Sequence, residues 1–124
     1  SEPMSNPPVQ NAVQRVVTRD GVELALTRLG HQGSGVLLLH GLTANRFSFD
    51  LDDQHSLARE LSRDFRVYIL ELRGHGQSQM PRPRRWAVES YIREDVPAAL
   101  RQIQAEGVQK IHAVGHSMGG IVLL

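Results

Sequence analysis

An unbroken run of apolar residues at 36–39 (Val-Leu-Leu-Leu), ending at His40, constrains the fold more than any other feature of the sequence. A strand with one face in water alternates apolar and polar side chains, and this run leaves no position for a polar one. It therefore predicts a strand covered on both faces, as in a parallel sheet between helices. Segments 66–71 and 110–115 have the same apolar character and predict two further buried strands.

Two helical patterns lie between these predicted strands. The first spans about residues 53–63, and its apolar positions at helical spacing are Leu57, Ala58 and Leu61. The second spans about residues 90–106, starting near Ser90 and ending at Gly107. Its apolar face comprises Ile92, Val96, Ala99, Leu100 and Ile103. Pro97 lacks an amide proton, so we expect it either in the first turn of this helix or at a kink.

A hairpin precedes the first buried strand. Residues 12–18 predict a strand, Arg19-Asp20-Gly21 a turn, and residues 22–27 a second strand with alternating apolar side chains. An antiparallel hairpin followed by a parallel β-α-β-α-β succession predicts the α/β fold class. Residues 1–11 are polar and rich in proline, and we expect this N-terminal segment to be disordered.

Composition and charge exclude several classes of protein. Fourteen basic and thirteen acidic residues give a net charge of +1, and the one basic cluster, Arg82, Arg84 and Arg85, is too small for firm nucleic-acid binding. The absence of cysteine excludes disulfides, thiolate nucleophiles and zinc sites built on cysteine. The apolar runs are too short for a membrane span. We therefore expect no nucleic-acid partner and no membrane span, and the absence of a visible signal peptide slightly favours the cytoplasm.

Residues 115–119 read Gly-His-Ser-Met-Gly, which matches the pattern G-x-S-x-G. The motif directly follows a predicted buried strand, and the small apolar segment after it can start a helix. A sharp strand-to-helix turn there projects the Ser117 hydroxyl from the sheet, while Gly115 and Gly119 leave room for the tight backbone. Ser117 is therefore a candidate nucleophile, and the alternative is a turn serine that caps the following helix.

Two other loops follow predicted parallel strands. His40-Gly41-Leu42 follows the first buried strand, and residues 73–78 (Arg-Gly-His-Gly-Gln-Ser) follow the next. Ligands of an open α/β sheet bind outside the carboxyl ends of its strands, so we expect the first loop to face the same crevice as Ser117. There the backbone N–H groups of Leu42 and Met118 can form an oxyanion hole for acyl transfer.

These three motifs, in this order and spacing, resemble the N-terminal half of α/β-hydrolase-fold proteins of the serine esterase and lipase type. The resemblance implies a nucleophile at Ser117, an oxyanion hole at Leu42 and Met118, and an acyl-enzyme formed from a small carboxylic ester or related acyl substrate, without a cofactor. The supporting loop positions that it implies are His40, Gly41, Gly115, His116 and Gly119. Residues 12–124 are then the N-terminal portion of one hydrolase domain, truncated after the nucleophile elbow.

The resemblance also implies catalytic groups that this sequence lacks. In that family the acid and the histidine follow the nucleophile, and none of the six histidines follows Ser117. We therefore expect both groups, and cover for the last strand, to come from sequence beyond residue 124 or from a second chain. Two alternatives stay open: a non-catalytic binding or assembly fragment of hydrolase origin, and another cofactor-free activity on this fold, such as a haloperoxidase or a lyase.

Other polar residues near these strand ends have less specific interpretations. His112 and His116 are four residues apart, but they lie on a strand and its turn rather than on a helix, so we expect no metal site. Glu71 is able to orient a histidine, although the resemblance places the acid on a later strand. We expect His40 and His75 to have structural roles in their loops.

Overall fold

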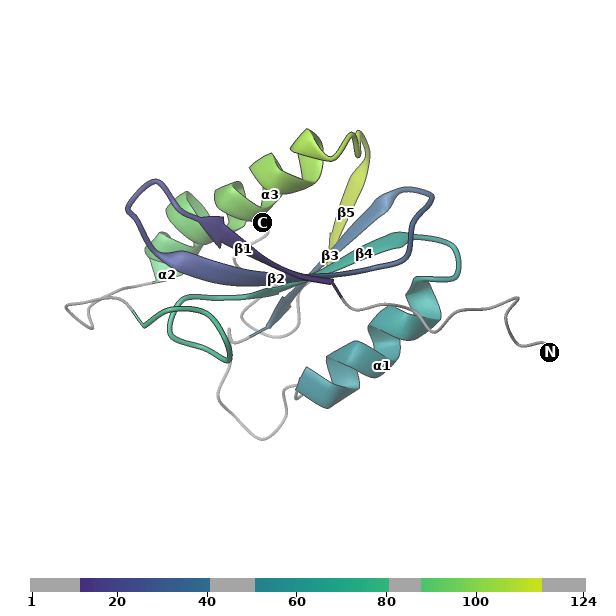
Figure 1. Ribbon diagram of the computed structural model, residues 1–124, viewed down its shortest axis with the longest axis horizontal. Helices are drawn as coiled ribbons and strands as arrows, with labels where there is room; N and C mark the ends of the chain where they lie inside the picture. The colour runs from purple at the N-terminus through teal and green to yellow at the C-terminus, as the bar shows by residue number, and fades with distance from the viewer. Residues whose placement is uncertain (1–11, 41–50, 81–87, 115–124) are drawn as a thin grey trace.

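The computed structural model describes residues 12–40, 51–80 and 88–114. Over these ranges five strands form one mixed sheet in the order β1-β2-β4-β3-β5 (Figure 1). The strands are β1 (Ala12–Val17), β2 (Glu23–Leu29), β3 (Gly35–His40), β4 (Arg66–Glu71) and β5 (Ile111–Val114). Each of the five predicted strands is present, with bounds close to the predicted ones.

The strand directions confirm the predicted α/β fold. β1 and β2 form the antiparallel hairpin, and β2 also runs antiparallel to β4. β3 runs parallel to both of its neighbours, β4 and β5. Because the chain places β4 between β2 and β3, the strand order departs from the sequence order, and β3 takes a central position in the parallel part of the sheet.

Helices cover both faces of this sheet. The helical elements are α1 (Leu51–Leu61), α2 (Val88–Ser90), η2 (Tyr91–Asp95) and α3 (Val96–Ala105). α1 lies on one face, and α2, η2 and α3 follow one another along the opposite face (Figure 1). Within the described ranges, no helix combines the length and the apolar character needed to cross a membrane.

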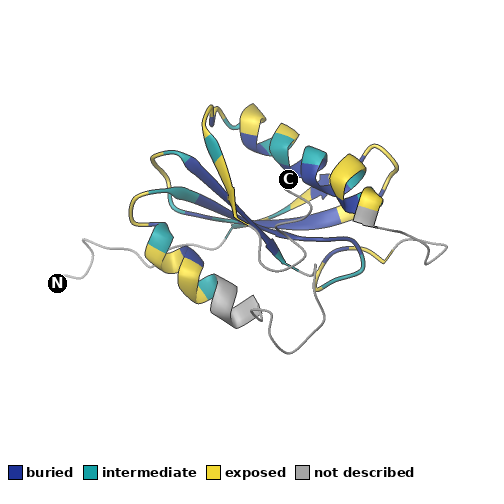
Figure 2. Cartoon of the chain, turned by 180° about the vertical axis from the view of Figure 1, so that it is seen from behind, coloured by how far each residue is buried: buried dark blue, intermediate teal, exposed yellow. Residues whose placement is uncertain are grey.

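Each face of the sheet has its own apolar core, and β3 and β4 contribute to both. The core under α3 includes Leu24, Leu26, Leu37, Leu39, Tyr68, Leu70, Ala99 and Ile103. The smaller core under α1 consists of Leu29, Val36, Leu38, Ala58, Val67 and Ile69. Alternate residues of β3 and β4 therefore point into opposite cores, which confirms that both strands are buried on both faces (Figure 2).

A wide helical turn precedes Pro97 and changes the predicted apolar face. Pro97 lies in the first turn of α3, and the preceding η2 is a π-helical turn in which the Val96 amide donates to the Tyr91 carbonyl. The extra residue in that turn shifts the helical stripe. Ile92, predicted on the buried face, is 44% exposed, whereas Asp95 is fully buried. The prediction for Ile92 is wrong because a strict α-helical period does not hold across residues 91–95.

β5 is less buried than its sequence predicts. Three of its four residues are exposed, and Val114 has 45% of its surface accessible (Figure 2). β5 pairs with β3 on one side, and no other strand of the described ranges pairs with its opposite edge. An apolar strand at the border of a sheet lacks the neighbour that would bury it. Leu57, at 36% exposure, is likewise outside the core that its neighbour Ala58 joins.

Candidate active site

Each of the three sequence motifs begins at the carboxyl end of a parallel strand, and these three strand ends are adjacent. In the β3–β4 ladder His40 is the partner of Glu71, and in the β3–β5 ladder Leu38 is the partner of Val114. β3 lies between the other two strands. The segments that follow β3, β4 and β5 therefore start from adjacent strands at the carboxyl edge of the parallel sheet, where open α/β sheets bind their ligands.

The predicted nucleophile, both predicted oxyanion-hole residues and most of the predicted supporting positions lie outside the described residues. These positions are Gly41, Leu42, Gly115, His116, Ser117, Met118 and Gly119. The roles assigned to them stay predictions. Of the predicted site residues, His40 is described: it ends β3, is partly buried, and its carbonyl accepts a hydrogen bond from the Leu72 amide at 3.2 Å.

The loop after β4 folds around the carboxylate of Glu71. Glu71 is 2% exposed, and its Oε2 accepts the Gln77 amide at 2.6 Å. Gly76 has a φ of 52°, and a Cβ at this position would lie 2.5 Å from Glu71 Oε2, so the loop requires glycine here. The Ser78 hydroxyl donates to the Glu71 carbonyl and accepts the Ala25 amide at 2.8 Å. Glu71 thus stabilises its own loop and connects it to β2.

His75 adopts the turn role predicted from the sequence. Its amide donates to the Leu72 carbonyl at 3.0 Å, and its Nδ1 lies 3.0 Å from the Arg73 carbonyl oxygen. Both contacts are local to the turn. The His75 ring therefore takes part in the geometry of the loop rather than pairing with an acid.

A buried ion pair that the sequence analysis did not anticipate holds this loop against the helical layer. Arg73 Nε donates to Asp95 Oδ1 at 2.8 Å, and the Arg73 amide donates to Asp95 Oδ2 at the same distance. Arg73 also forms a two-bond contact with Asp20 in the β1–β2 turn, at 2.8 and 3.0 Å. The Arg73 side chain is 4% exposed, so three separate segments meet at one buried guanidinium.

The pKa values of the two acids in this cluster shift in opposite directions. The hydrogen bond from Arg73 lowers the pKa of Asp20, whose side chain remains 43% exposed. Burial raises the pKa of Asp95, against the opposing effect of the Arg73 hydrogen bonds. The sequence signal for this cluster was an acid inside an apolar helical stripe, at Asp95, together with an arginine directly after a buried strand, at Arg73.

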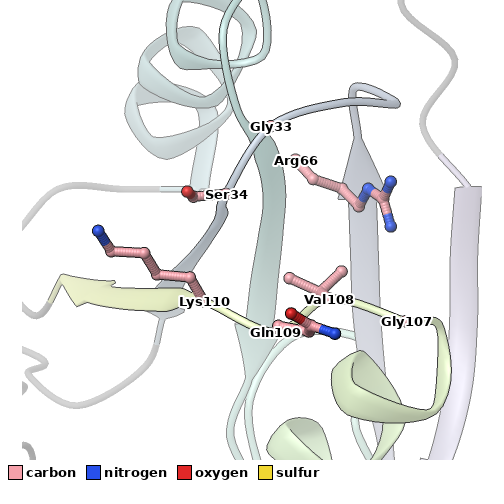
Figure 3. A pocket seen from close by; sticks show the side chains of 7 residues that line it. All are labelled: Gly33, Ser34, Arg66, Gly107, Val108, Gln109 and Lys110. Atoms are coloured by element: carbon pink, nitrogen blue, oxygen red, sulfur yellow. The ribbon is translucent and has the colours of Figure 1, made fainter.

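The described residues contain no cluster of side chains suited to a metal ion. Within ranges 12–40, 51–80 and 88–114, no group of three or more His, Asp or Glu side chains is placed to hold a metal ion. An open cavity of about 390 Å³ lies between the β2–β3 loop, the start of β4 and residues 107–110. Figure 3 shows Arg66 and Lys110 extending to opposite sides of this cavity. It lies at the amino ends of the parallel strands, away from the edge at which β3, β4 and β5 end.

Sequence comparison assigns this architecture to a family. The sequence profile of the α/β hydrolase fold matches residues 36–124, a range that covers most of the chain and contains all three motifs. The chain belongs to the α/β-hydrolase fold family. The resemblance inferred from His40-Gly41-Leu42, the loop after β4 and G-x-S-x-G is thereby confirmed at the level of the family and its fold.

Individual relatives agree with this membership. The chain is 33% identical over 101 residues to the dihydrolipoyllysine-residue acetyltransferase component of an acetoin cleaving system from Cupriavidus necator, and 32% identical over 104 residues to epoxide hydrolase 4 from Mus musculus. Each match covers 82% of this chain. A solved α/β hydrolase from Novosphingobium aromaticivorans superposes with a TM-score of 0.75 at 29% identity, covering 94% of this chain and 39% of the other.

The chain corresponds to a fraction of these relatives. It spans 24% of the Cupriavidus protein and 26% of the mouse protein. The relatives are therefore longer proteins, and their remaining segments have no counterpart among the described residues.

Proposed function

We propose that the complete protein is a serine hydrolase that cleaves a carboxylic ester or related acyl compound through an acyl-enzyme on Ser117. The observation that carries the proposal is the placement of β5 beside β3, since Ser117 lies three residues after the end of β5 and Leu42 two residues after the end of β3. Membership of the α/β-hydrolase fold family supports the same assignment, because G-x-S-x-G after a parallel strand matches the family's nucleophile turn.

The proposed reaction has two steps. The Ser117 oxygen attacks the acyl carbon and loses its proton to a base, the carbonyl oxygen becomes negative, and the alcohol leaves with a proton as the acyl-enzyme forms. Water then attacks the acyl-enzyme and releases the acid. The backbone N–H groups of Leu42 and Met118 stabilise the negative oxygen in both steps. The proposed reaction also requires a base and a carboxylate that orients it.

A covalent probe tests this proposal on the complete protein. A fluorophosphonate reagent phosphonylates an activated serine, and we expect mass spectrometry to find one adduct on the peptide that contains Ser117. Ser117→Ala should abolish both labelling and hydrolysis of p-nitrophenyl esters, a loss of at least about 10³-fold, while circular dichroism and the melting temperature stay unchanged. Ester hydrolysis that persists in Ser117→Ala contradicts the proposal.

The relatives favour a second candidate, opening of an epoxide. Two of the matched proteins, from Siraitia grosvenorii and Mus musculus, are named epoxide hydrolases. Parallel assays of the complete protein with p-nitrophenyl acetate and styrene oxide separate the two candidates. Faster turnover of the epoxide favours the second candidate, and oxidation of a halide by peroxide would identify the haloperoxidase alternative. If no substrate is turned over and Ser117 stays unlabelled, the non-catalytic binding fragment is favoured.

A further inference from the structure

The amide groups of Leu72 and Arg73, just past the end of β4, have partners in two different layers of the molecule. The Leu72 amide donates to the His40 carbonyl at 3.2 Å, one step beyond the last ladder pair of β3 and β4. The next amide, that of Arg73, donates to Asp95 in η2 at 2.8 Å. The backbone at Leu72–Arg73 therefore links the end of β3 to η2, on the face of the sheet that α3 covers.

The side chain of Arg73 fixes this link in position. Its guanidinium contacts the fully buried Asp95 and the half-exposed Asp20, so it connects the β1–β2 turn, the loop after β4 and η2. A planar guanidinium with several donors in fixed directions restrains its partners in orientation as well as in distance. An ammonium group at the same position would keep the charge and lose that restraint.

The π-helical turn places Asp95 where the link needs it. In the predicted α-helical stripe Ile92 faces the sheet, whereas in the structure Ile92 is 44% exposed and Asp95 is 0% exposed. The wide turn thus brings an acid to the sheet at the cost of exposing an apolar side chain, and π turns of this kind occur frequently at functional sites. Hydrophobic packing alone does not explain why the acid Asp95 is buried while the apolar Ile92 is exposed.

We propose that Arg73, held by Asp95 and Asp20, is a positioning residue that sets the place of the His40 carbonyl at the carboxyl end of β3. This inference rests on the proposed function, since His40 starts the segment assigned to the oxyanion hole. Displacement of a catalytic donor by about 1 Å lowers a rate by about 100-fold, so a loosened β3 end reduces the rate of acylation. Substrate affinity depends on other parts of the site and changes little.

The test compares Arg73→Lys with Glu106→Gln in the complete protein. Glu106 accepts hydrogen bonds at the other end of α3 from side chains that do not contact Arg73, so its substitution lowers stability without removing a partner of Arg73. Both variants are assayed at a temperature well below their melting points. For Arg73→Lys we expect kcat for p-nitrophenyl acetate and the rate of fluorophosphonate labelling to fall at least 10-fold, with KM within about twofold of wild type. For Glu106→Gln we expect both rates to stay within about twofold.

Equal kcat values in wild type and Arg73→Lys overturn the inference, as does an equal loss in Glu106→Gln. Asp20→Asn is the second variant if Arg73→Lys does not fold. It removes the negative charge of the half-exposed partner and leaves the ion pair with Asp95 in place. It should reduce kcat in the same direction by a smaller factor, and an unchanged kcat contradicts the inference.

Amide hydrogen exchange separates failure of this inference from failure of the proposed function. If wild-type Ser117 is not labelled, the proposed function fails, and the link is then judged by exchange alone. Arg73→Lys should accelerate exchange of the Leu72 amide by at least 10-fold, while exchange of amides within β4 stays unchanged and Glu106→Gln leaves Leu72 unaffected. Unchanged exchange at Leu72 in Arg73→Lys shows that Arg73 does not set this position.

Discussion

Two carboxylates join the ends of α3 to the sheet, and they do so by different means. Asp95, just before α3, is fully buried and pairs with one cation, Arg73. Glu106, just after α3, has a side chain that is 16% exposed. Its carboxylate accepts hydrogen bonds from four side chains: Gln14, Arg28, Tyr68 and Gln102. One contact depends on a single ion pair, and the other is shared among four donors.

The difference between the two ends appears in their ionisation. Burial raises the pKa of Asp95 despite its arginine partner. Burial acts in the same direction on Glu106, but the hydrogen bonds from Gln102, Gln14, Tyr68 and Arg28 together lower its pKa. Partial contact with water and a larger number of donors therefore favour the charged form more than one buried cation does. Loss of a partner should therefore lower the free energy of unfolding more at the Asp95 end of α3 than at the Glu106 end.

Removal of the arginine at the Asp95 end should have the largest effect on stability. Arg73→Met keeps most of the side-chain volume and leaves Asp95 as a buried acid without its cation, which costs about 3–5 kcal/mol of unfolding free energy. Arg28→Met is the matched control at the Glu106 end. Because Arg28 is one of four donors and its side chain is 34% exposed, we expect a loss of about 1 kcal/mol or less. Urea unfolding of the complete protein measures the unfolding free energy of each variant. Equal losses in Arg73→Met and Arg28→Met would contradict the expected difference between the two ends.

Removal of one neutral donor at the Glu106 end should have a moderate effect. Tyr68→Phe deletes the hydroxyl that donates to Glu106 Oε1 at 2.8 Å and leaves the buried ring in place. Three donors remain, so we expect a loss of about 1 kcal/mol in unfolding free energy. In the wild type, burial and Glu106 raise the pKa of Tyr68 to about 12. A loss above about 3 kcal/mol shows that the four donors act as a single unit.

The pH dependence of the two ends should differ in sign, and this is the smallest effect. The folded pKa of Glu106 lies below its ordinary value of 4.5, so Glu106 adds stability above pH 4.5 that is lost as the pH falls through the folded value. The stability lost in Glu106→Gln therefore grows with pH across that window. The folded pKa of Asp95 lies above its ordinary value of 3.8, so the stability lost in Asp95→Asn shrinks as pH rises from 3.8. Urea unfolding between about pH 3 and 6 gives both slopes.

The parts of the fold that sequence predicted well depend on local patterns. The apolar runs of β3 and β4, the Gly21 turn and the β-α-β order each follow from neighbouring residues, and all are present in the structure. β5 has the same local pattern as β3, yet its burial depends on which strands flank it. That property belongs to the order of the sheet, so the run at 111–114 could not predict it.

The parts of the site that sequence did not predict depend on distant partners. Arg73 is 22 residues from Asp95 and 53 from Asp20, and no periodic pattern relates such positions. The apolar stripe predicted for residues 90–106 was based on 3.6 residues per turn. The π-helical turn η2 does not follow this period, so Ile92 is exposed. His75 was predicted correctly as a turn residue because its contacts lie within three positions.

The wide turn before Pro97 also limits which changes of length this region tolerates. Each residue of an α-helix advances the side-chain direction by about 100°, so deletion of one residue from 91–95 would return the segment to an ordinary helix. Because the π turn holds one residue more than an α turn, the residues on either side of the deletion would keep nearly the same direction toward the sheet. Loss of one residue between Ser90 and Pro97 is thus compatible with the same cover of the sheet, and we expect homologues to differ in length there by that single residue.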